Sequence, residues 1–354
     1  MMNKFKYLNN FWKGKKVFLT GHTGFKGSWF SILLNLLGAK VAGYSLKPNS
    51  NLNLFELAKL NKIIHKNIFG DIRDYNKLKK SIKNFSPDFV VHMAAQSLVR
   101  DSYFSPKYTY EVNTLGTVNV LNILNELKFI KSALIITTDK VYFNNNKKNF
   151  YKENSLLGGL DPYSNSKSCA ELVVNSYNRS FFEKKNIFVA TARAGNVIGG
   201  GDFSKDRILP DFFRSLLKNK KLILRSPNSI RPWQHVIDPL YGYLLLLIKL
   251  YKKQTITSDA FNFGPKKSNN KSVNDVINLI NKEFNNSVRV IKKTNSLKNY
   301  HESKILMLNS DKSKKILNWD TKYNLEQSIK LTSCWFKDFF EKKKYFRSNS
   351  KSNY

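Results

Sequence analysis

The sequence predicts a doubly wound α/β fold, in which a parallel sheet carries helices on both faces and a smaller second lobe follows it. Three observations favour this class. The first half of the chain alternates short β-rich runs with longer segments of helical periodicity. The β-rich runs are apolar at nearly every position, as expected for parallel strands covered on both sides. A glycine-rich turn separates the first such run from the first helix.

The alternation places the elements along the chain. We expect strands of the sheet at Lys16–Thr20, Lys40–Leu46, Asn67–Ile72, Asp88–Ala95, Ala133–Thr138, Phe188–Val197 and Ala260–Gly264. Apolar residues at helical spacing predict connecting helices at Ser28–Gly38, Tyr75–Asn84, Val112–Leu127 and Ser164–Glu183. After about Asn196 the alternation gives way to loop-rich sequence, with helices expected at Asp275–Glu283 and Asn324–Phe340 and a strand at Val288–Lys293.

This change in pattern suggests two lobes. Residues 12–196 are expected to form the sheet domain, to which residues 233–264 return with one further strand. Residues 197–232 and 265–340 are assigned to the second lobe. Residues 341–354 are charged and polar, and we expect them to form a frayed tail.

The high positive charge of the chain is interpreted as an effect of composition and not as a nucleic-acid-binding site. The formal net charge is +35, from 60 Lys and Arg against 25 Asp and Glu. Only 10 of the basic residues are Arg, and the Lys residues are scattered instead of forming one block. Because nucleic-acid sites favour Arg, whose planar fork binds phosphates and base edges, we expect no specific nucleic-acid partner.

The cysteine spacing and the hydropathy pattern indicate where in the cell the protein is located and whether it binds a metal. The two cysteines, Cys169 and Cys334, show no metal-ligand or disulfide framework, and the first residues lack the apolar segment of a secretory signal. The most apolar run, Tyr243–Leu250, is too short to cross a bilayer. We therefore expect a cytoplasmic protein without a membrane partner. The histidines show no ligand spacing, so no metal is expected.

The glycine-rich turn "GHTGFKG" is the first candidate binding site. Gly21, Gly24 and Gly27 lie between a strand and a helix, where one glycine permits a tight turn, another lets a pyrophosphate approach the backbone, and the third allows close packing. The phosphates of a dinucleotide would then lie at the N-terminus of the helix. His22, within the turn, is placed to contact these phosphates.

The ends of the second and third strands are where the adenosine half of such a dinucleotide would bind. The second strand ends without the acidic residue that would bind the ribose of NAD, so this position leaves NAD and NADP both open. Asp71 and Ile72, after the third strand, could bracket the adenine. A loop acid or helix cap is an equally good interpretation of Asp71.

A Tyr–Lys pair is the second candidate site. Tyr163 and Lys167 in "DPYSNSKSCAEL" are four residues apart at the start of a helix, so both side chains lie on one face. A nearby ammonium group would favour the phenolate of Tyr163, which could then act as a general base toward a sugar hydroxyl. The spacing alone is weakly specific, and it gains weight from its position after the glycine-rich turn.

The ordered motifs carry a family resemblance. GxxGxxG, "MAAQ", "TTDKVY", YxxxK and "RAGNVIGGGD" resemble the extended short-chain dehydrogenase/reductases that act on nucleotide sugars. Within this family, "GHTGFKGSW", "DKVY", "LGGLDPYSNSK", "GNVIGGGDFSKDRILPD" and "RPWQHVIDPLYGYL" are similar to the CDP-glucose 4,6-dehydratases. The resemblance spans roughly Trp12 to Phe339 and implies a Rossmann sheet domain, NAD as cofactor and a nucleotide-sugar substrate. It also implies that the second lobe binds that substrate.

The resemblance implies a reaction without net redox change. Tyr163 would take the proton of the C4 hydroxyl while the hydride of C4 passes to NAD, to be returned to C6 in the last step. Thr138 would bond the C4 oxygen, and Lys167 would hold the cofactor ribose. Asp139 would then act as acid toward the C6 hydroxyl and Lys140 as base toward C5. Lys140 is a base only when neutral; alternatively it stays charged and stabilises the enolate while another group takes the proton.

The remaining site residues follow from the same resemblance. The cofactor residues it implies are Gly21, His22, Gly24, Phe25, Lys26, Gly27, Asp71, Ile72, Ala94, Ala95, Tyr163 and Lys167. The substrate diphosphate and base would be bound by Asn196 and Arg231, with Arg207 and His235 behind them, whereas Arg193 on its strand could be structural.

Three alternatives to this function stay open. A nucleotide-sugar 4-epimerase would share Thr138, Tyr163 and Lys167 but would not need Asp139 and Lys140. A 4,6-dehydratase of a dTDP-, GDP- or UDP-sugar is the second alternative, and a basic NAD-binding protein without catalysis is the third. Relatives of this kind commonly form homodimers through two helices per subunit, here near Val112–Leu127 and Ser164–Glu183.

Overall fold

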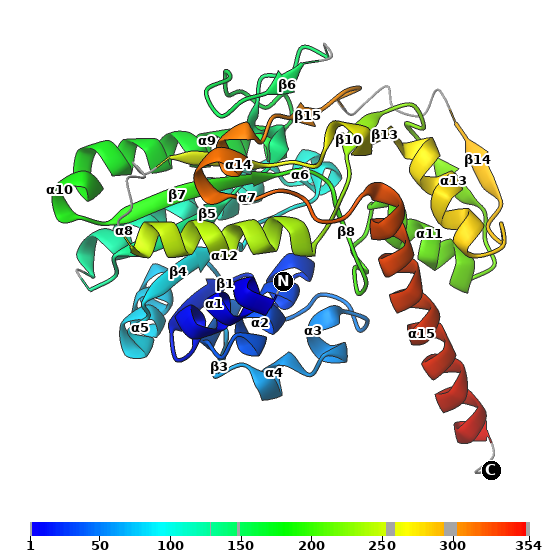
Figure 1. The fold of residues 1–354 in the computed structure, drawn as a ribbon, viewed down its shortest axis with the longest axis horizontal. Coiled ribbons are helices and arrows are strands. Elements are labelled where there is room, and N and C mark those ends of the chain that lie inside the picture. The colour runs from blue at the N-terminus through cyan, green and yellow to red at the C-terminus, as the bar shows by residue number, and fades with distance from the viewer. Residues whose placement is uncertain (1, 128, 147–148, 253–258, 294–302, 352–354) are drawn as a thin grey trace.

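A seven-stranded parallel sheet forms the centre of the molecule (Figure 1). The computed structural model describes residues 2–127, 129–146, 149–252, 259–293 and 303–351. In spatial order the strands are β12 (Ala260–Phe263), β7 (Phe188–Ala194), β5 (Ser132–Ile136), β4 (Phe89–His92), β1 (Lys16–Thr20), β2 (Lys40–Ser45) and β3 (Lys66–Phe69). The doubly wound α/β class is therefore confirmed. Strand order reverses between β1 and β4, and such a switch point creates a crevice at the carboxyl ends of the strands.

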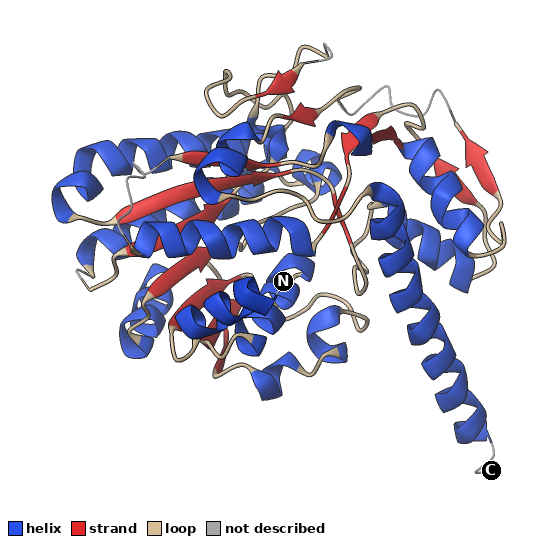
Figure 2. Cartoon of the chain, in the orientation of Figure 1, coloured by secondary structure: helices blue, strands red, loops and turns tan. Residues whose placement is uncertain are grey.

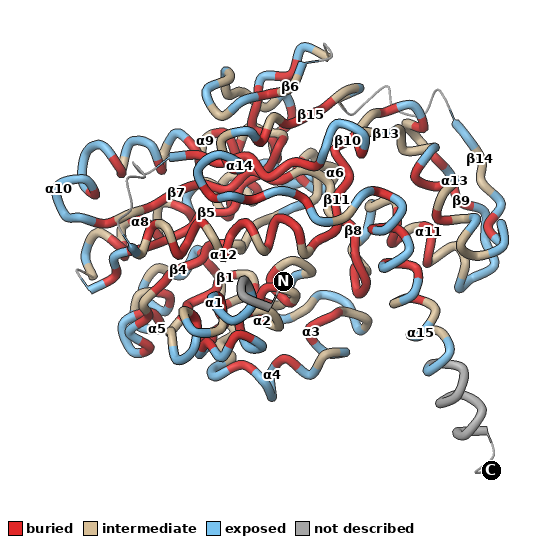
Figure 3. The backbone as a smooth tube through the Cα atoms, viewed as in Figure 1, coloured by how far each residue is buried: buried red, intermediate tan, exposed pale blue. Residues whose placement is uncertain are grey.

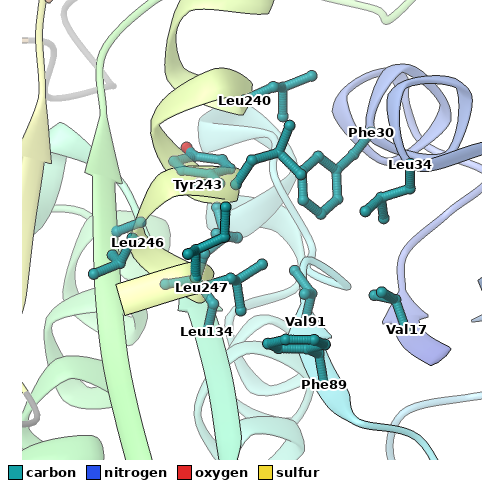
Figure 4. Packing of buried hydrophobic residues seen from close by; sticks show 14 of the residues in the cluster. Val17, Phe30, Leu34, Phe89, Val91, Leu134, Leu240, Tyr243, Leu246 and Leu247 are labelled. Atoms are coloured by element: carbon teal, nitrogen blue, oxygen red, sulfur yellow. The ribbon is translucent and has the colours of Figure 1, made fainter. Parts of the chain in front are cut away.

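Alternate residues of the strands bury two separate apolar clusters, one on each face. The first cluster joins Val17 and Leu19 of β1 to three helices, α1 (Met2–Trp12), α2 (Phe25–Leu36) and α12 (Ile237–Tyr251). Figure 4 shows Tyr243, Leu246 and Leu247 of α12 packed toward the strand residues of this cluster. These helices make one side of the sheet inaccessible to water.

The opposite face is covered by helices from the first half of the chain. They are α5 (Tyr75–Phe85), α8 (Gly116–Glu126), α9 (Pro162–Tyr177) and the π-helical segments η1 (Glu111–Leu115) and η3 (Asn178–Phe182). Phe18 of β1 and Val90 of β4 are fully buried beneath them. Burial on both faces explains why the strands are apolar along their length (Figure 3).

A second group of elements lies beside the carboxyl ends of the strands (Figure 2). Its apolar cluster is rich in phenylalanine, with the rings of Phe213 and Phe336 stacked at 3.5 Å between centroids. The elements of this second lobe are α11 (Ile208–Leu217), β9 (Leu222–Leu224), β10 (Ile230–Pro232), β13 (Asn270–Ser272), α13 (Val273–Glu283), β14 (Val290–Lys292) and α15 (Leu325–Lys351). Its position against the sheet leaves a cleft between the two parts.

Short elements complete the chain. Two pairings of two-residue strands, short helices and single turns make up the remaining elements of the described residues. They comprise α3 (Leu54–Leu57), α4 (Leu60–Ile63), α6 (Val99–Phe104), α7 (Pro106–Tyr110), η2 (Asp139–Val141), β6 (Phe150–Tyr151), α10 (Glu183–Lys185), β8 (Val197–Ile198), β11 (Gln234–His235), η4 (Lys267–Asn269), β15 (Met307–Leu308) and α14 (Asp311–Leu317).

Three segments differ from the sequence-based expectation. Helix α1 was not predicted, because its apolar residues Leu8 and Trp12 are embedded in polar sequence; the helix is stabilised by their burial. Helix α11 begins where a loop was expected, and Leu209 and Phe212 supply its buried face. Residues 341–351 continue α15 instead of forming a frayed tail, whereas residues 352–354 lie outside the described part of the chain.

Candidate active site

The cleft at the carboxyl ends of the strands is a cavity of about 820 Å³. Residues that directly follow β1, β4, β5 and β7 line one side of it, and the second lobe lines the other. Polar groups gather here because the strand ends emerge from the core at this edge. The candidate residues therefore meet in one place although they are spread over more than 200 positions of the sequence.

The glycine-rich turn shapes one end of the cleft. Gly21 has φ +78°, and a Cβ at Gly27 would lie 2.1 Å from the carbonyl oxygen of Gly21, so both positions require glycine for the turn itself. Gly24 differs: a Cβ there would meet only the oxygen of Gly21, at 3.4 Å. Gly24 also precedes the first residue of α2 without a side-chain cap. The turn thus offers an open backbone surface and uncapped helix N–H groups, which fit the pyrophosphate of a dinucleotide.

His22 and Lys26, both within this turn, have different environments. His22 is completely buried and does not line the cleft; its Nε2 bonds to Oδ1 of Asn67 at 2.7 Å. Its side chain braces the turn from beneath, so we no longer place it at the phosphates. Lys26 does line the cleft, and its Nζ donates to the hydroxyl of Tyr243 at 3.1 Å. Burial, reinforced by the charges of Arg207 and Lys167, lowers the pKa of Lys26 to about 7.

The other predicted cofactor residues also line the cleft. They are Phe25, Asp71, Ile72, Ala94 and Ala95. The carboxylate of Asp71 bonds to the guanidinium of Arg73, with a shortest distance of 2.8 Å. Hydrogen bonds from Arg73 hold the pKa of Asp71 below its usual range, so this loop acid is ionised. Tyr44, at the end of β2 where an acid was expected, donates its hydroxyl to the backbone oxygen of Asp71 at 2.9 Å.

Tyr163 and Thr138 meet at the centre of the cleft. Helix α9 begins with its N-cap Asp161 accepting from the N–H of Ser164 at 2.9 Å, which fixes the first turn that carries Tyr163. The side chain of Thr138 lies within hydrogen-bonding reach of the phenol. Burial raises the pKa of Tyr163 to about 12, although the bond from Thr138 acts in the opposite direction. A further positive charge is therefore needed before this phenol can act as a base near neutral pH.

Lys167 lies one helical turn beyond Tyr163 on the same face. Its Nζ donates to the backbone oxygen of Ile136 at 3.1 Å, which anchors it to the end of β5. Burial lowers the pKa of Lys167 to about 8, and the neighbouring carboxylate of Glu171 partly offsets this effect. The ammonium form is thus retained at pH 7, close to the cofactor side of the cleft.

Asp139 and Lys140 form an ion pair directly beside Thr138. Oδ1 of Asp139 accepts from the hydroxyl of Thr138 at 3.0 Å and from Nζ of Lys140 at 3.2 Å. Among the described residues nothing bonds to Oδ2 of Asp139, which is buried. The side chain of Lys140 is 28% exposed and lines the cleft, whereas Asp139 is not part of the lining. Lys140 is therefore the member of the pair that a bound molecule reaches first.

The predicted substrate residues do not all reach the cleft. Asn196, Arg207 and Arg231 line it, and Oδ1 of Asn196 is buried without a hydrogen bond from the described residues. Arg207 donates to Oδ2 of Asp202 at 3.2 Å. His235 lies outside the lining and packs its ring against Tyr323, with 5.5 Å between ring centroids. Burial lowers its pKa to about 4, so His235 is a neutral side chain of the interior.

A buried ion pair between Arg193 and Glu171 lies behind the cleft, and only Arg193 was predicted from the sequence. Two nitrogen atoms of Arg193 donate to the carboxylate of Glu171, at 3.0 and 2.9 Å, and the hydroxyls of Thr137 and Thr191 complete its shell. Arg193 therefore has the structural position that its strand suggested. Glu171 could have been found in the sequence, because it lies four residues after Lys167 and so on the same face of the helix.

The described residues contain neither a group of metal ligands nor a membrane-spanning helix. Within the described ranges, no three His, Cys, Asp or Glu side chains are grouped as a metal site would require. No helix in the part of the chain that the structure covers is long and apolar enough to span a bilayer.

Comparison with known proteins adds to this geometry. The family model described as GDP-mannose 4,6 dehydratase matches residues 18–332. The chain belongs to this family. It is part of the extended short-chain dehydrogenase/reductases, as the motifs indicated. A CDP-glucose 4,6-dehydratase of Salmonella typhimurium is 43% identical over 333 residues, which cover 93% of this chain and 92% of that protein.

Solved structures of similar fold include a dehydratase and an epimerase. A dTDP-glucose 4,6-dehydratase from Bacillus anthracis in complex with NAD superposes with a TM-score of 0.76 at 22% identity, covering 92% of this chain and 97% of the other. A UDP-glucose 4-epimerase from Thermotoga maritima with UDP-glucose gives 0.79 at 20% identity, covering 92% and 99%. Both likenesses show that the chain has the fold of the family.

Proposed function

We propose that this protein is an NAD-dependent lyase that converts CDP-glucose into CDP-4-dehydro-6-deoxyglucose and water. The observation that carries the proposal is the contact of Thr138 with both Tyr163 and the Asp139–Lys140 ion pair in one cleft. Oxidation at C4 needs the first contact, and elimination across C5 and C6 needs the pair. The 43% identity to a CDP-glucose 4,6-dehydratase supports the choice of substrate.

The cofactor site agrees with a dinucleotide. Gly21, Gly24 and Gly27 would hold the pyrophosphate, and Ile72, Ala94 and Ala95 would contact the adenosine half from the neighbouring strand ends. When bound, NAD supplies the two-electron acceptor that takes hydrogen from C4 and returns it to C6. Lys167 would donate to the nicotinamide ribose from its anchored position at the end of β5.

Tyr163 is the proposed base for the first step. It would take the proton of the C4 hydroxyl while Thr138 donates a hydrogen bond to the same oxygen. Because burial raises the pKa of Tyr163 to about 12 in the cofactor-free protein, the positive charges nearby must stabilise its phenolate. The guanidinium of Arg207 acts in this direction, and the ammonium of Lys167, one helical turn from Tyr163 on the same face, would add to it.

Asp139 and Lys140 are proposed to carry out the elimination. Once C4 is a ketone, the proton at C5 is acidic, and loss of the C6 hydroxyl requires an acid on the other side. Lys140 lines the cleft, so it would face C5, and Asp139 would protonate the leaving oxygen. The 3.2 Å contact between them would give the proton that Lys140 takes from C5 a direct route through Asp139 to the leaving oxygen.

The second lobe is proposed to bind the nucleotide. Arg207 and Arg231 are the cations that would face the diphosphate, since guanidinium groups match phosphate oxygens with two parallel bonds. The unpaired Oδ1 of Asn196 would accept a bond from a substrate hydroxyl. His235 is left out of this set, because its ring is buried away from the cleft.

A homodimer is proposed for the assembled enzyme. Leu115 of η1 and Leu172 of α9 are 55% and 59% exposed, on neighbouring helices of the face opposite α12. Apolar residues of this size on adjacent helices are typical of an interface. Sedimentation analysis of the wild type and a Leu172→Glu variant would test this arrangement.

The two cysteines are free thiols, which is compatible with the reducing cytoplasm proposed for the enzyme.

Transfer of a label tests the function. Glucose labelled with deuterium at C4 is supplied as its CDP, dTDP, UDP and GDP derivatives in separate reactions. Deuterium at C6 of a 4-keto product from the CDP sugar is expected, with slower turnover of the other three. Inversion at C4 with retention of the C6 hydroxyl would identify an epimerase and contradict the proposal.

A further inference from the structure

One carboxylate in the cleft is shared by arginines from both lobes. Oδ1 of Asp206 accepts from Arg100 at 2.8 Å and from Arg225 at 3.2 Å, and all three residues line the cleft. Arg100 belongs to α6, which follows β4, whereas Arg225 follows β9 in the second lobe. Asp206 has φ +53°, a left-handed conformation that costs a non-glycine residue energy. Its side chain is thus held at this point of the cleft by the surrounding structure.

The charge state of Asp206 is fixed by its neighbours. Burial acts to raise the pKa of Asp206, but hydrogen bonds and charges from Arg100 and Arg225 outweigh burial and lower it. The group is therefore a carboxylate at neutral pH. Among the described residues no hydrogen bond is made to its Oδ2, and its side chain is 28% exposed. One acceptor oxygen is available to a ligand beside the remaining N–H donors of Arg225.

Asp206 and Arg225 line the cleft from the second lobe, whereas Thr138 and Tyr163 line it from the sheet domain. A nucleotide sugar whose sugar ring contacts Tyr163 and whose diphosphate contacts Arg207 extends its base further into the second lobe. Arg225 and Asp206 are a hydrogen-bond donor and acceptor that line the cleft from the second lobe.

Apolar residues beside the pair can hold a flat ring. Leu222 and Leu224 of β9 are buried in the second lobe, so Ile223 between them points to the opposite face and is 48% exposed. Arg225 follows on that same face by strand alternation. Leu209, Val273 and Phe336 also contribute to the lining. An exposed isoleucine two residues from an arginine, next to buried apolar side chains, is suited to stacking of an aromatic ring above a hydrogen-bonding group.

We propose that Arg225 and Asp206 bind the hydrogen-bonding edge of cytosine and thereby select the base of the nucleotide. The inference rests on the proposed function and specifies how its substrate is chosen. Cytosine presents two acceptors, O2 and N3, beside the N4 amino donor. Arg225 has only donors and Asp206 only acceptors, so together they match this edge. Uracil and thymine carry a carbonyl oxygen at position 4, which would face the carboxylate of Asp206 and be repelled.

The test compares bases in variants of the holoenzyme. Dissociation constants for CDP and UDP are measured by calorimetry, and kcat/KM is measured with CDP-glucose and UDP-glucose. The wild type is expected to favour cytosine at least about tenfold, the usual effect of a matched pair of base contacts. Asp206→Asn should reduce this preference about tenfold, because an amide can present either a donor or an acceptor to position 4.

Two further variants separate base recognition from other roles. Asp211→Asn removes another cleft carboxylate, which pairs with Arg214, and should leave the preference unchanged. Arg100→Gln removes the other partner of Asp206 and should weaken both nucleotides equally. If Asp206→Asn weakens CDP and UDP by the same factor, or if Arg100→Gln abolishes the preference as fully, Asp206 only joins the lobes and the inference is overturned.

The outcomes also distinguish this inference from the proposed function. Absence of dehydration with every nucleotide-glucose rejects the proposed function, while the CDP and UDP titrations still report on the base site. Dehydration of CDP-glucose with an unchanged base preference in Asp206→Asn rejects the base site alone.

Discussion

Nζ of Lys140 lies 3.2 Å from Oδ1 of Asp139, and the same oxygen accepts the hydroxyl of Thr138. The two groups proposed for the elimination are therefore one ion pair, connected to the residue that holds the C4 oxygen. A change at Lys140 alters the charge that Asp139 experiences, so neither side chain has an independent role. This coupling decides how a variant at either position should be interpreted.

Lys140→Met should block elimination more strongly than oxidation. Without the amine, no group at this position can take the C5 proton, and a loss of about a hundredfold or more in turnover is expected for removal of a general base. Oxidation at C4 depends on Tyr163 and should continue. Rapid-quench analysis would then show the 4-keto-glucose nucleotide accumulating while the 6-deoxy product is lost. Lys205→Met, at an exposed position of the same cleft, is the control. Unchanged turnover of Lys140→Met would rule out a chemical role.

Lys26 should make the cofactor-free protein more stable as pH rises. Burial lowers its pKa to about 7, whereas an unfolded lysine titrates near about 10.4. Between these values the unfolded chain binds more protons, so the free energy of unfolding increases with pH over this window. Below pH 7 both forms are protonated and the full destabilisation, roughly 5 kcal/mol at most, is present. The free energy of unfolding, measured with urea between pH 6.5 and 10, should increase less steeply with pH in Lys26→Met than in the wild type.

Control variants separate the effect of Lys26 on the pH dependence of stability from that of the other lysines. Lys167 also titrates lower than usual, and its charge acts on Lys26, so part of the pH dependence that Lys26→Met retains comes from Lys167. Lys205→Met removes the same charge from an exposed position and should retain the wild-type slope. Equal slopes for Lys26→Met and the wild type would show that Lys26 is not buried as an ammonium.

Arg193→Met should destabilise the fold without touching the cleft. Its loss leaves the carboxylate of Glu171 buried with only two hydroxyl donors, and an unpaired buried charge costs about 3–5 kcal/mol. Lys79→Met breaks the exposed pair with Glu126 and should cost at most about 1 kcal/mol. Chemical denaturation of both variants provides the measurement. A loss in Arg193→Met no greater than in Lys79→Met would mean that the network contributes little to stability.

The fold and the reaction centre could be predicted because both depend on regular spacing. Apolar runs identified the strands, and the four-residue spacing of Tyr163 and Lys167 placed both on one helical face. His22 could not be placed in this way. The backbone turns at Gly21 with φ +78°, and no periodicity tells to which side the next side chain points. It points inward, where the absence of a side chain on Gly43 gives its ring room.

The second lobe was harder to predict for a related reason. Its cleft residues come from loops and short strands, and their partners are distant in sequence. Arg100 and Asp206 are 106 positions apart, and nothing local in either segment indicates the contact. The same holds for α1, whose burial depends on aromatic packing of Trp12 against Phe89 across the sheet face. Such contacts are set by tertiary structure and not by propensity.

Gly24 and Gly27 should differ in what an added methyl group disrupts. In Gly27→Ala the Cβ would lie 2.1 Å from the backbone oxygen of Gly21, so the turn must shift, at a cost of about 1–3 kcal/mol or more. In Gly24→Ala the nearest atom is 3.4 Å away and the backbone, at φ −75°, is allowed for alanine. Gly24→Ala should therefore keep the melting temperature of the wild type while binding NAD about tenfold more weakly, a loss of about 1.4 kcal/mol. Thermal unfolding and NAD titration of the two variants separate these effects, and wild-type affinity in Gly24→Ala would exclude the pyrophosphate from this turn.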